Sequence, residues 1–181
     1  MSVFPDFPRE IADAARVTYR ALLAAHPNEH FYAFALFTDG GAMTVVPAAN
    51  SDEGLKRIRE KMEVADDDDA PEFTWAPAEW AYESAEADSF NPLCKRLADT
   101  VLGPNFQEAK FGEFFRDLQH DMIEALRLLD QEGLFGTGAE REKITLFVSI
   151  SDDDGAVQLE NESAKVLNPP AVFDRFIKRY D

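Results

Sequence analysis

Histidine, cysteine and carboxylate side chains are the groups in this sequence that could do chemistry. His26 and His30 have the four-residue spacing of two zinc ligands on one helix face. Pro27 lies between them and would end such a helix, so the spacing does not predict a metal site. His120 lies among charged residues in a stretch of helical periodicity, and no nucleophile is evident for it to serve as a general base. Cys94 has no histidine close to it in the sequence, which favours a small buried side chain over a catalytic thiol.

Two acidic runs could be interpreted as cation-binding loops. Residues 152–154 precede a glycine, as in a calcium loop, but the first ligand position of that motif falls on Ile150. The run 66–69 lacks the alternating spacing and the glycine of such a loop, so we expect a solvated, exposed segment. The glycines in residues 133–138 follow a predicted helix and lack the lysine of a phosphate-binding loop. The sequence therefore predicts no catalytic residue, no metal and no cofactor.

The stretch from residue 75 to residue 83 combines tryptophan with acidic side chains. A buried tryptophan needs a partner for its N–H, and one interpretation places both indoles at the edge of the core. A second interpretation is an exposed aromatic anchor surrounded by carboxylates, a common composition for a protein-binding hot spot. Under this second interpretation, and with the nearby acidic run included, the binding residues are Trp75, Glu79, Trp80, Glu83, Asp66, Asp67, Asp68 and Asp69.

The chain carries a large excess of negative charge. Its 181 residues include 35 Asp and Glu against 18 Lys and Arg, a formal net charge of -17. Nucleic acids and anionic membranes attract basic surfaces, so we expect neither as a partner. A negative field speeds the capture of a cationic partner, and a basic protein is the partner that the charge favours. The alternative is that the charge serves solubility alone.

These residues must be positioned by a core, and the composition allows one. Because 45% of the residues are hydrophobic and 12% aromatic, the chain can bury apolar side chains despite its charge. Apolar spacing predicts a helix from about Pro8 to just before Pro27, followed by a strand over residues 31–38 that is apolar on both faces. The Asp-Gly-Gly turn after it predicts a tight hairpin with a return strand over residues 42–47.

The elements that follow are predicted from caps and periodicity. Asn50 is expected to cap a second helix, with Glu53 completing a capping box. Asn91 and Asn168 are each expected to cap a helix that begins with the next residue, a proline. Further predicted elements are a strand at residues 72–75, a long helix over residues 112–132 ended by Gly133, and a strand over residues 143–151.

This order of elements predicts an α+β fold, with an antiparallel-rich sheet of about four or more strands packed against helices. The length suits a single domain over residues 1–181. No basic leader with a long apolar segment is evident near residue 1, and we expect a cytoplasmic protein.

Several stretches together resemble a bacterial family of unknown function, numbered 4303. They are Phe31 to Phe34 running into Thr38 and Asp39, residues 47–50 and 53–55, Trp75 with residues 77–80, and residues 132–136, 150–152 and 167–169. These are framework residues of strands, caps and turns, and the resemblance implies no catalytic residue. In size, acidity and order of elements the chain is also similar to the immunity proteins of bacterial toxin systems, including the Smi1/Knr4-like group.

The expected function is that of a non-enzymatic acidic binding protein, such as an immunity protein that neutralises a basic toxin. One alternative is an enzyme whose site is built from carboxylates and His120. A second alternative is a domain whose charge serves only solubility.

Overall fold

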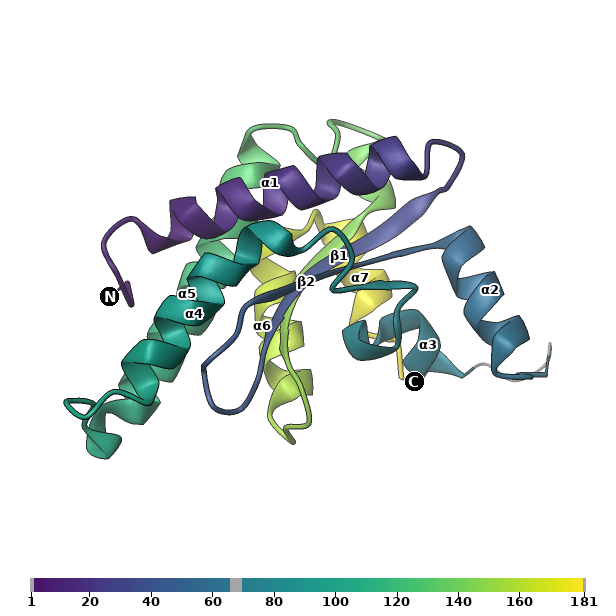
Figure 1. Cartoon of the computed structure of the whole chain (residues 1–181). Helices are drawn as coiled ribbons and strands as arrows, with labels where there is room; N and C mark the ends of the chain where they lie inside the picture. Colours follow the sequence, from purple (N-terminus) through teal and green to yellow (C-terminus); the bar gives the residue numbers. More distant parts are fainter. Residues whose placement is uncertain (1, 66–69, 181) are drawn as a thin grey trace.

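The computed structural model describes residues 2–65 and 70–180, and over these residues seven α-helices surround a four-stranded sheet (Figure 1). The strand order is β3-β2-β1-β4. The strands are β1 (Phe31–Thr38), β2 (Val46–Ser51), β3 (Tyr82–Glu83) and β4 (Thr145–Ile150). β2 pairs antiparallel with both β1 and β3, whereas β4 pairs parallel with β1. The predicted α+β class and the mainly antiparallel sheet are confirmed.

The larger core covers one face of the sheet. Phe34 and Leu36 of β1 point into it, together with Leu146 and Val148 of β4. The helices that close this face are α1 (Phe7–Ala25), α4 (Asn91–Val101) and α5 (Phe111–Gln131), which occupy the top and left of Figure 1.

A smaller, aromatic core covers the other face. Alternate strand residues, among them Ala33 and Ala35, leave room there for the rings of Phe147 and Phe176, whose centroids lie 4.8 Å apart. This face is closed by α3 (Pro71–Trp75) and α7 (Pro170–Phe176). Burial on both faces explains why β1 is apolar on both sides.

α6 (Ala156–Leu167) covers the outer edge of β4. The N–H of Val148 donates to Oγ of Ser163 at 2.9 Å. Asn168 serves both backbone groups of Leu146: its Oδ1 accepts from the N–H at 2.8 Å and its Nδ2 donates to the carbonyl at 2.6 Å. These side chains satisfy the edge of a strand that would otherwise present unpaired backbone groups.

The long helices and the two longest predicted strands are largely where the sequence predicts them. α1 ends at Ala25, before Pro27, and β1 spans residues 31–38 as predicted. α5 ends beside Gly133, which has a left-handed φ of 77°, and the N–H of Leu134 returns to the carbonyl of Leu129. The remaining helix is α2 (Asp52–Lys61), and 3₁₀ turns lie at Pro77–Glu79, Asp88–Phe90, Glu108–Lys110 and Arg141–Lys143.

Two predicted strands are wrong in place or type. Residues 72–75 lie in α3, which begins with Pro71, because proline suits the first turn of a helix. The return strand β2 begins at Val46 and not at residue 42. The carboxylate of Asp39 accepts from the N–H groups of Gly41 and Met43 and from the hydroxyl of Thr44, which holds a longer loop in place of a tight turn.

The predicted asparagine caps are also wrong. Ser51 caps α2, with Oγ accepting from the N–H of Gly54 at 2.9 Å, while Asn50 is buried and donates to the hydroxyl of Tyr32. Asn91 is the first residue of α4 and not its cap. Asn168 binds β4, as described above, and α6, which precedes it, has no counterpart among the predicted elements. No helix of the described residues is long and apolar enough to cross a membrane.

Candidate functional site

A groove of about 340 Å³ lies at the carboxyl ends of β1 and β4. Because these strands are parallel, their carboxyl ends meet at one edge of the sheet, the usual position of ligand sites in parallel sheets. Strand ends, the 3₁₀ turn Pro77–Glu79 and the start of α6 line this groove. Its apolar surface comes from Phe37, Pro77, Ile150, Val157 and Tyr180.

The charged lining of the groove is acidic. Glu79, Asp152, Asp153 and Glu160 line it, and no Lys, Arg or His is among the described residues that do. Glu79, Asp152 and Asp153 are exposed and form no ion pair with any described residue. Oδ1 of Asp153 accepts from the N–H of Gly155 at 2.7 Å, which orients that carboxylate without neutralising it. We call Glu79, Asp152 and Asp153 the acidic rim.

A buried ion pair supports the groove from below. Nη2 of Arg179 lies 2.7 Å from Oε2 of Glu160, and their side chains are 1% and 6% exposed. The other carboxylate oxygen of Glu160 accepts from Oγ of Ser149 at 2.6 Å. The guanidinium also packs over the ring of Phe176, 3.9 Å from its centroid. The pair holds the C-terminal segment, with Tyr180, against α6 and β4. The charges of Arg179 and Glu160 neutralise each other.

The structure separates the residues that the sequence groups together as a binding surface. Glu79 lies on the acidic rim, whereas Glu83 is exposed on β3 and does not line the groove. Trp80 is 3% exposed, and its Nε1 donates to the carbonyl of Thr74 at 3.1 Å. Trp75 is half-buried against Phe176. The indoles therefore pack with the smaller core, and the predicted residues Asp66, Asp67, Asp68 and Asp69 lie outside the described residues.

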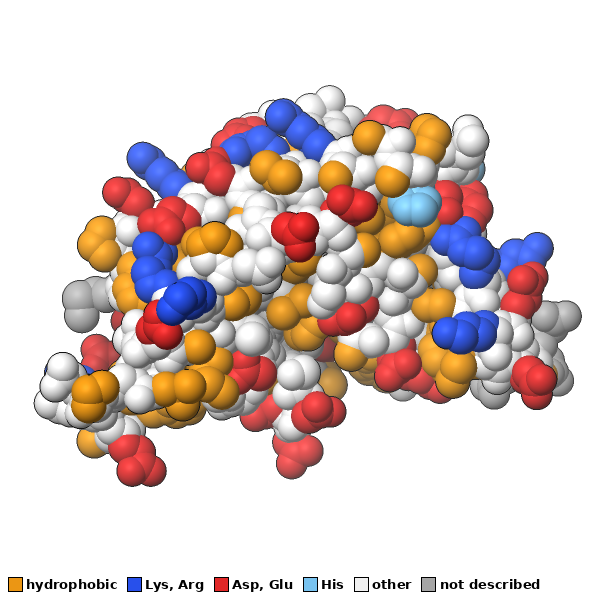
Figure 2. All heavy atoms as spheres, in the orientation of Figure 1, with side chains coloured by type: hydrophobic (Ala, Val, Ile, Leu, Met, Phe, Trp, Pro, Cys, Tyr) orange, Lys and Arg blue, Asp and Glu red, His pale blue; other side chains and the backbone are white. Residues whose placement is uncertain are grey.

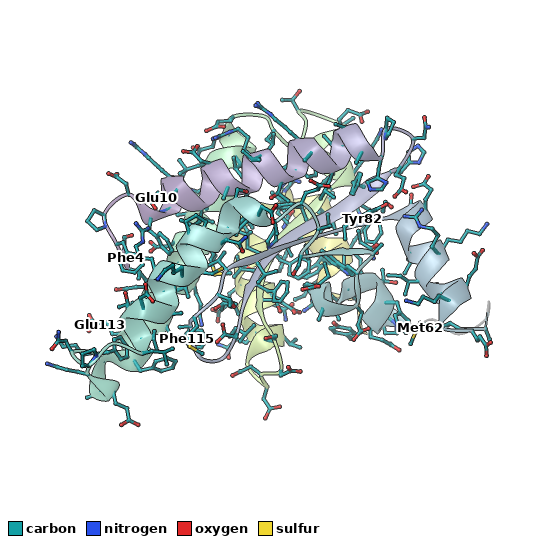
Figure 3. All side chains as sticks on the ribbon, in the orientation of Figure 1. Phe4, Glu10, Met62, Tyr82, Glu113 and Phe115 are labelled. Carbon is teal, nitrogen blue, oxygen red and sulfur yellow. The ribbon has the colours of Figure 1, made fainter. Side chains whose placement is uncertain are left out.

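A second polar cluster joins β2, α2 and β3, and its centre is Glu29, in the connection between α1 and β1. Its carboxylate accepts from the hydroxyls of Ser51 and Tyr82, both at 2.5 Å, and from Nη1 of Arg57 at 2.8 Å. Burial raises the pKa of Glu29, but these hydrogen bonds outweigh burial and lower the pKa to about 2. Figure 3 shows Tyr82 between α2 and the end of α1. Because the hydroxyl of Ser51 is committed to Glu29, we interpret the cluster as structural.

The three histidines lie in different surroundings. Nδ1 of His30 lies 2.7 Å from Oε1 of Glu53, and this hydrogen bond raises the pKa of His30. The ring of His26 packs on Tyr82, with centroids 4.6 Å apart. His120 is exposed on α5. Within residues 2–65 and 70–180 no group of three or more His, Cys, Asp or Glu side chains could hold a metal ion.

Comparison with known proteins identifies a family and no function. Neither a curated protein nor a solved structure matches the chain with significance. The model of the DUF4303 family, described as a domain of unknown function, matches residues 11–169. This match covers most of the chain and includes every strand of the sheet, α1 from Ile11 onward, and α2 to α6. The chain belongs to the DUF4303 family.

Proposed function

We propose that this chain is a non-catalytic binding protein that recognises a basic segment of another protein through the acidic rim. The observation that supports it most is the meeting of free carboxylates from two distant stretches, Glu79 and Asp152–Asp153, beside an apolar surface. A lysine or arginine side chain is complementary to this groove, because its methylene stem packs on apolar groups while its charged head pairs with carboxylates. Phe37, Ile150 and Tyr180 offer contacts to such a stem.

The charge of the whole molecule supports the same proposal. Figure 2 shows acidic side chains over the middle and lower part of the face seen in Figure 1, whereas Lys and Arg gather mainly over α1, α2 and α4. With a net charge of -17, the field draws a basic protein towards this surface before contact. An immunity protein that captures a basic toxin in the bacterial cytoplasm would associate with it faster because of this field.

Affinity purification from the native host at low salt tests the proposal. Three baits are compared: the wild-type protein, a rim variant and a control variant. The rim variant is Glu79→Gln/Asp152→Asn/Asp153→Asn, and the control variant is Asp6→Asn/Glu108→Gln/Glu113→Gln. The control removes the same number of charges from exposed residues that do not line the groove. We expect a stoichiometric basic partner with the wild type and the control, and at least a tenfold loss with the rim variant, about 1.4 kcal/mol. Equal recovery by both variants, or no partner at all, would contradict the proposal.

A further inference from the structure

A second cavity lies at the opposite end of the strands from the groove. It has a volume of about 720 Å³ and sits where the amino ends of the parallel strands β1 and β4 meet. His30 and Phe31 border it at the start of β1, and Lys143 and Ile144 border it just before β4. This volume lies within the range of small-molecule sites, and the surroundings combine apolar walls with polar groups, as such sites do.

The apolar wall and the charged groups of this cavity are distinct. Leu23, Leu134, Phe135 and Ile144 provide aliphatic and aromatic surface. Several of the charged groups satisfy one another. Nζ of Lys143 lies 2.7 Å from the carboxylate of Glu140, and Glu29 is saturated by the cluster described above.

Charges of both signs remain for a ligand. The carboxylates of Asp52 and Glu142 are exposed and make no hydrogen bond or salt bridge with the described part of the chain. Arg175 donates through Nη2 to the carbonyl of Glu142 at 2.7 Å, which leaves its other donors unused. His30 is held through Nδ1 by Glu53, so its Nε2 is also unused. The cavity therefore differs from the groove, where all the free charge is negative.

Tyr19 adds a hydroxyl group to the lining of the cavity. The residue is 2% exposed and lines the cavity, and its hydroxyl makes no hydrogen bond with any described residue. The hydroxyl is therefore available to a ligand in the cavity. Burial raises the pKa of this phenol to about 12, so it remains a hydrogen-bond donor at neutral pH.

We propose that this cavity binds a small zwitterion with an apolar body, the chemistry of a free apolar amino acid. Asp52 and Glu142 receive the ammonium group, and Arg175 with His30 receives the carboxylate. The phenol of Tyr19 donates to an oxygen of the ligand, and the wall formed by Leu134 and Phe135 contacts its side chain. The site depends neither on the acidic rim nor on a protein partner.

Isothermal titration calorimetry with defined probes tests this site. The probes are L-leucine and L-phenylalanine, the amine 3-methylbutylamine and the acid 4-methylpentanoate, which each retain one charge of leucine. We expect saturable binding of at least one amino acid with a Kd in the millimolar range or below, and at least tenfold weaker binding of both singly charged analogues. No saturation by either amino acid up to about 10 mM, or equal binding of an analogue, would overturn the proposal.

Variants of the lining residues separate binding from folding. Tyr19→Phe should weaken amino-acid binding about 2- to 10-fold, the worth of one hydrogen bond, without lowering Tm. Arg175→Gln should weaken the amino acid but not the amine, and Asp52→Asn/Glu142→Gln should weaken the amino acid but not the acid. His120→Gln, on the exposed side of α5, is the control and should change nothing. Unchanged binding by Tyr19→Phe and Arg175→Gln would overturn the assignment.

Discussion

Individual carboxylates in this protein have different roles, depending on the groups that surround them. Glu29 is surrounded by hydrogen-bond donors and has a structural role, whereas Glu79 and Asp152 form no ion pair with any residue in 2–65 or 70–180. Both kinds occur in an acidic sequence without any motif to tell them apart. The sequence named Glu79 as a binding residue because of its aromatic neighbours, yet Trp80 next to it belongs to the core.

The Glu29 cluster makes stability depend on acid pH. The pKa of Glu29 is about 2 in the folded protein against 4.5 for an ordinary glutamate, so its stabilisation is complete above about pH 4.5 and is lost as the pH falls towards 2. We expect Glu29→Gln to lower the free energy of unfolding by about 1–2 kcal/mol at pH 7, with a smaller difference from wild type at pH 3. Urea unfolding at several pH values measures this. Glu60→Gln, which breaks an exposed pair with Lys56, is the control. If Glu29→Gln lowered the free energy of unfolding by the same amount at pH 7 and at pH 3, the role of the Glu29 charge would be contradicted.

At the scale of elements, local signals predicted some features and could not predict others. The sequence predicts β1 and α5 because their apolar patterns are long and end at clear signals such as Gly133. The sequence does not predict α6, because this helix packs on the edge of β4 through small and polar side chains, among them Ser163 and Ala164, which leave a weak apolar stripe. The sequence pattern predicts Asn168 as a helix cap. The strand β4, to which Asn168 hydrogen-bonds, is not near it in the sequence and is identified only from the structure.

The edge of β4 should therefore depend on Asn168. Asn168→Ala removes the partners of both backbone groups of Leu146 at a covered edge, and we expect a loss of about 2–3 kcal/mol in the free energy of unfolding. Asn105→Ala, at an exposed asparagine, should cost less than about 0.5 kcal/mol. Chemical denaturation measures both variants. Asn168→Ala with wild-type stability would show that the edge bonds do not hold α6 in place.

At the scale of the whole molecule, the parallel pairing of β1 with β4 creates both candidate sites. It brings Phe37 into the same groove as Asp152 and Asp153, and it brings His30 into the same cavity as Lys143. The sequence shows where the negative charge is concentrated, but the distances between its stretches follow from this long-range pairing, which no local pattern predicts.

The net charge of -17 should govern the rate of association more than its specificity. For the partner recovered by affinity purification, we expect the association rate constant to fall at least tenfold between about 20 mM and 300 mM salt, as screening shortens the reach of the field. The dissociation rate constant should change less. Surface plasmon resonance over a salt series measures both. An association rate independent of salt would contradict electrostatic capture.

The central claim is that the acidic rim, and not the diffuse negative surface, binds basic chains. Its most direct test is a ¹⁵N NMR titration of the whole protein with a lysine- and arginine-rich peptide at moderate salt, repeated with the rim variant Glu79→Gln/Asp152→Asn/Asp153→Asn. We expect the largest shift changes at residues 77–79 and 149–157, and we expect them to disappear in the rim variant. Shift changes spread evenly over the acidic residues, or unchanged in the rim variant, would contradict it.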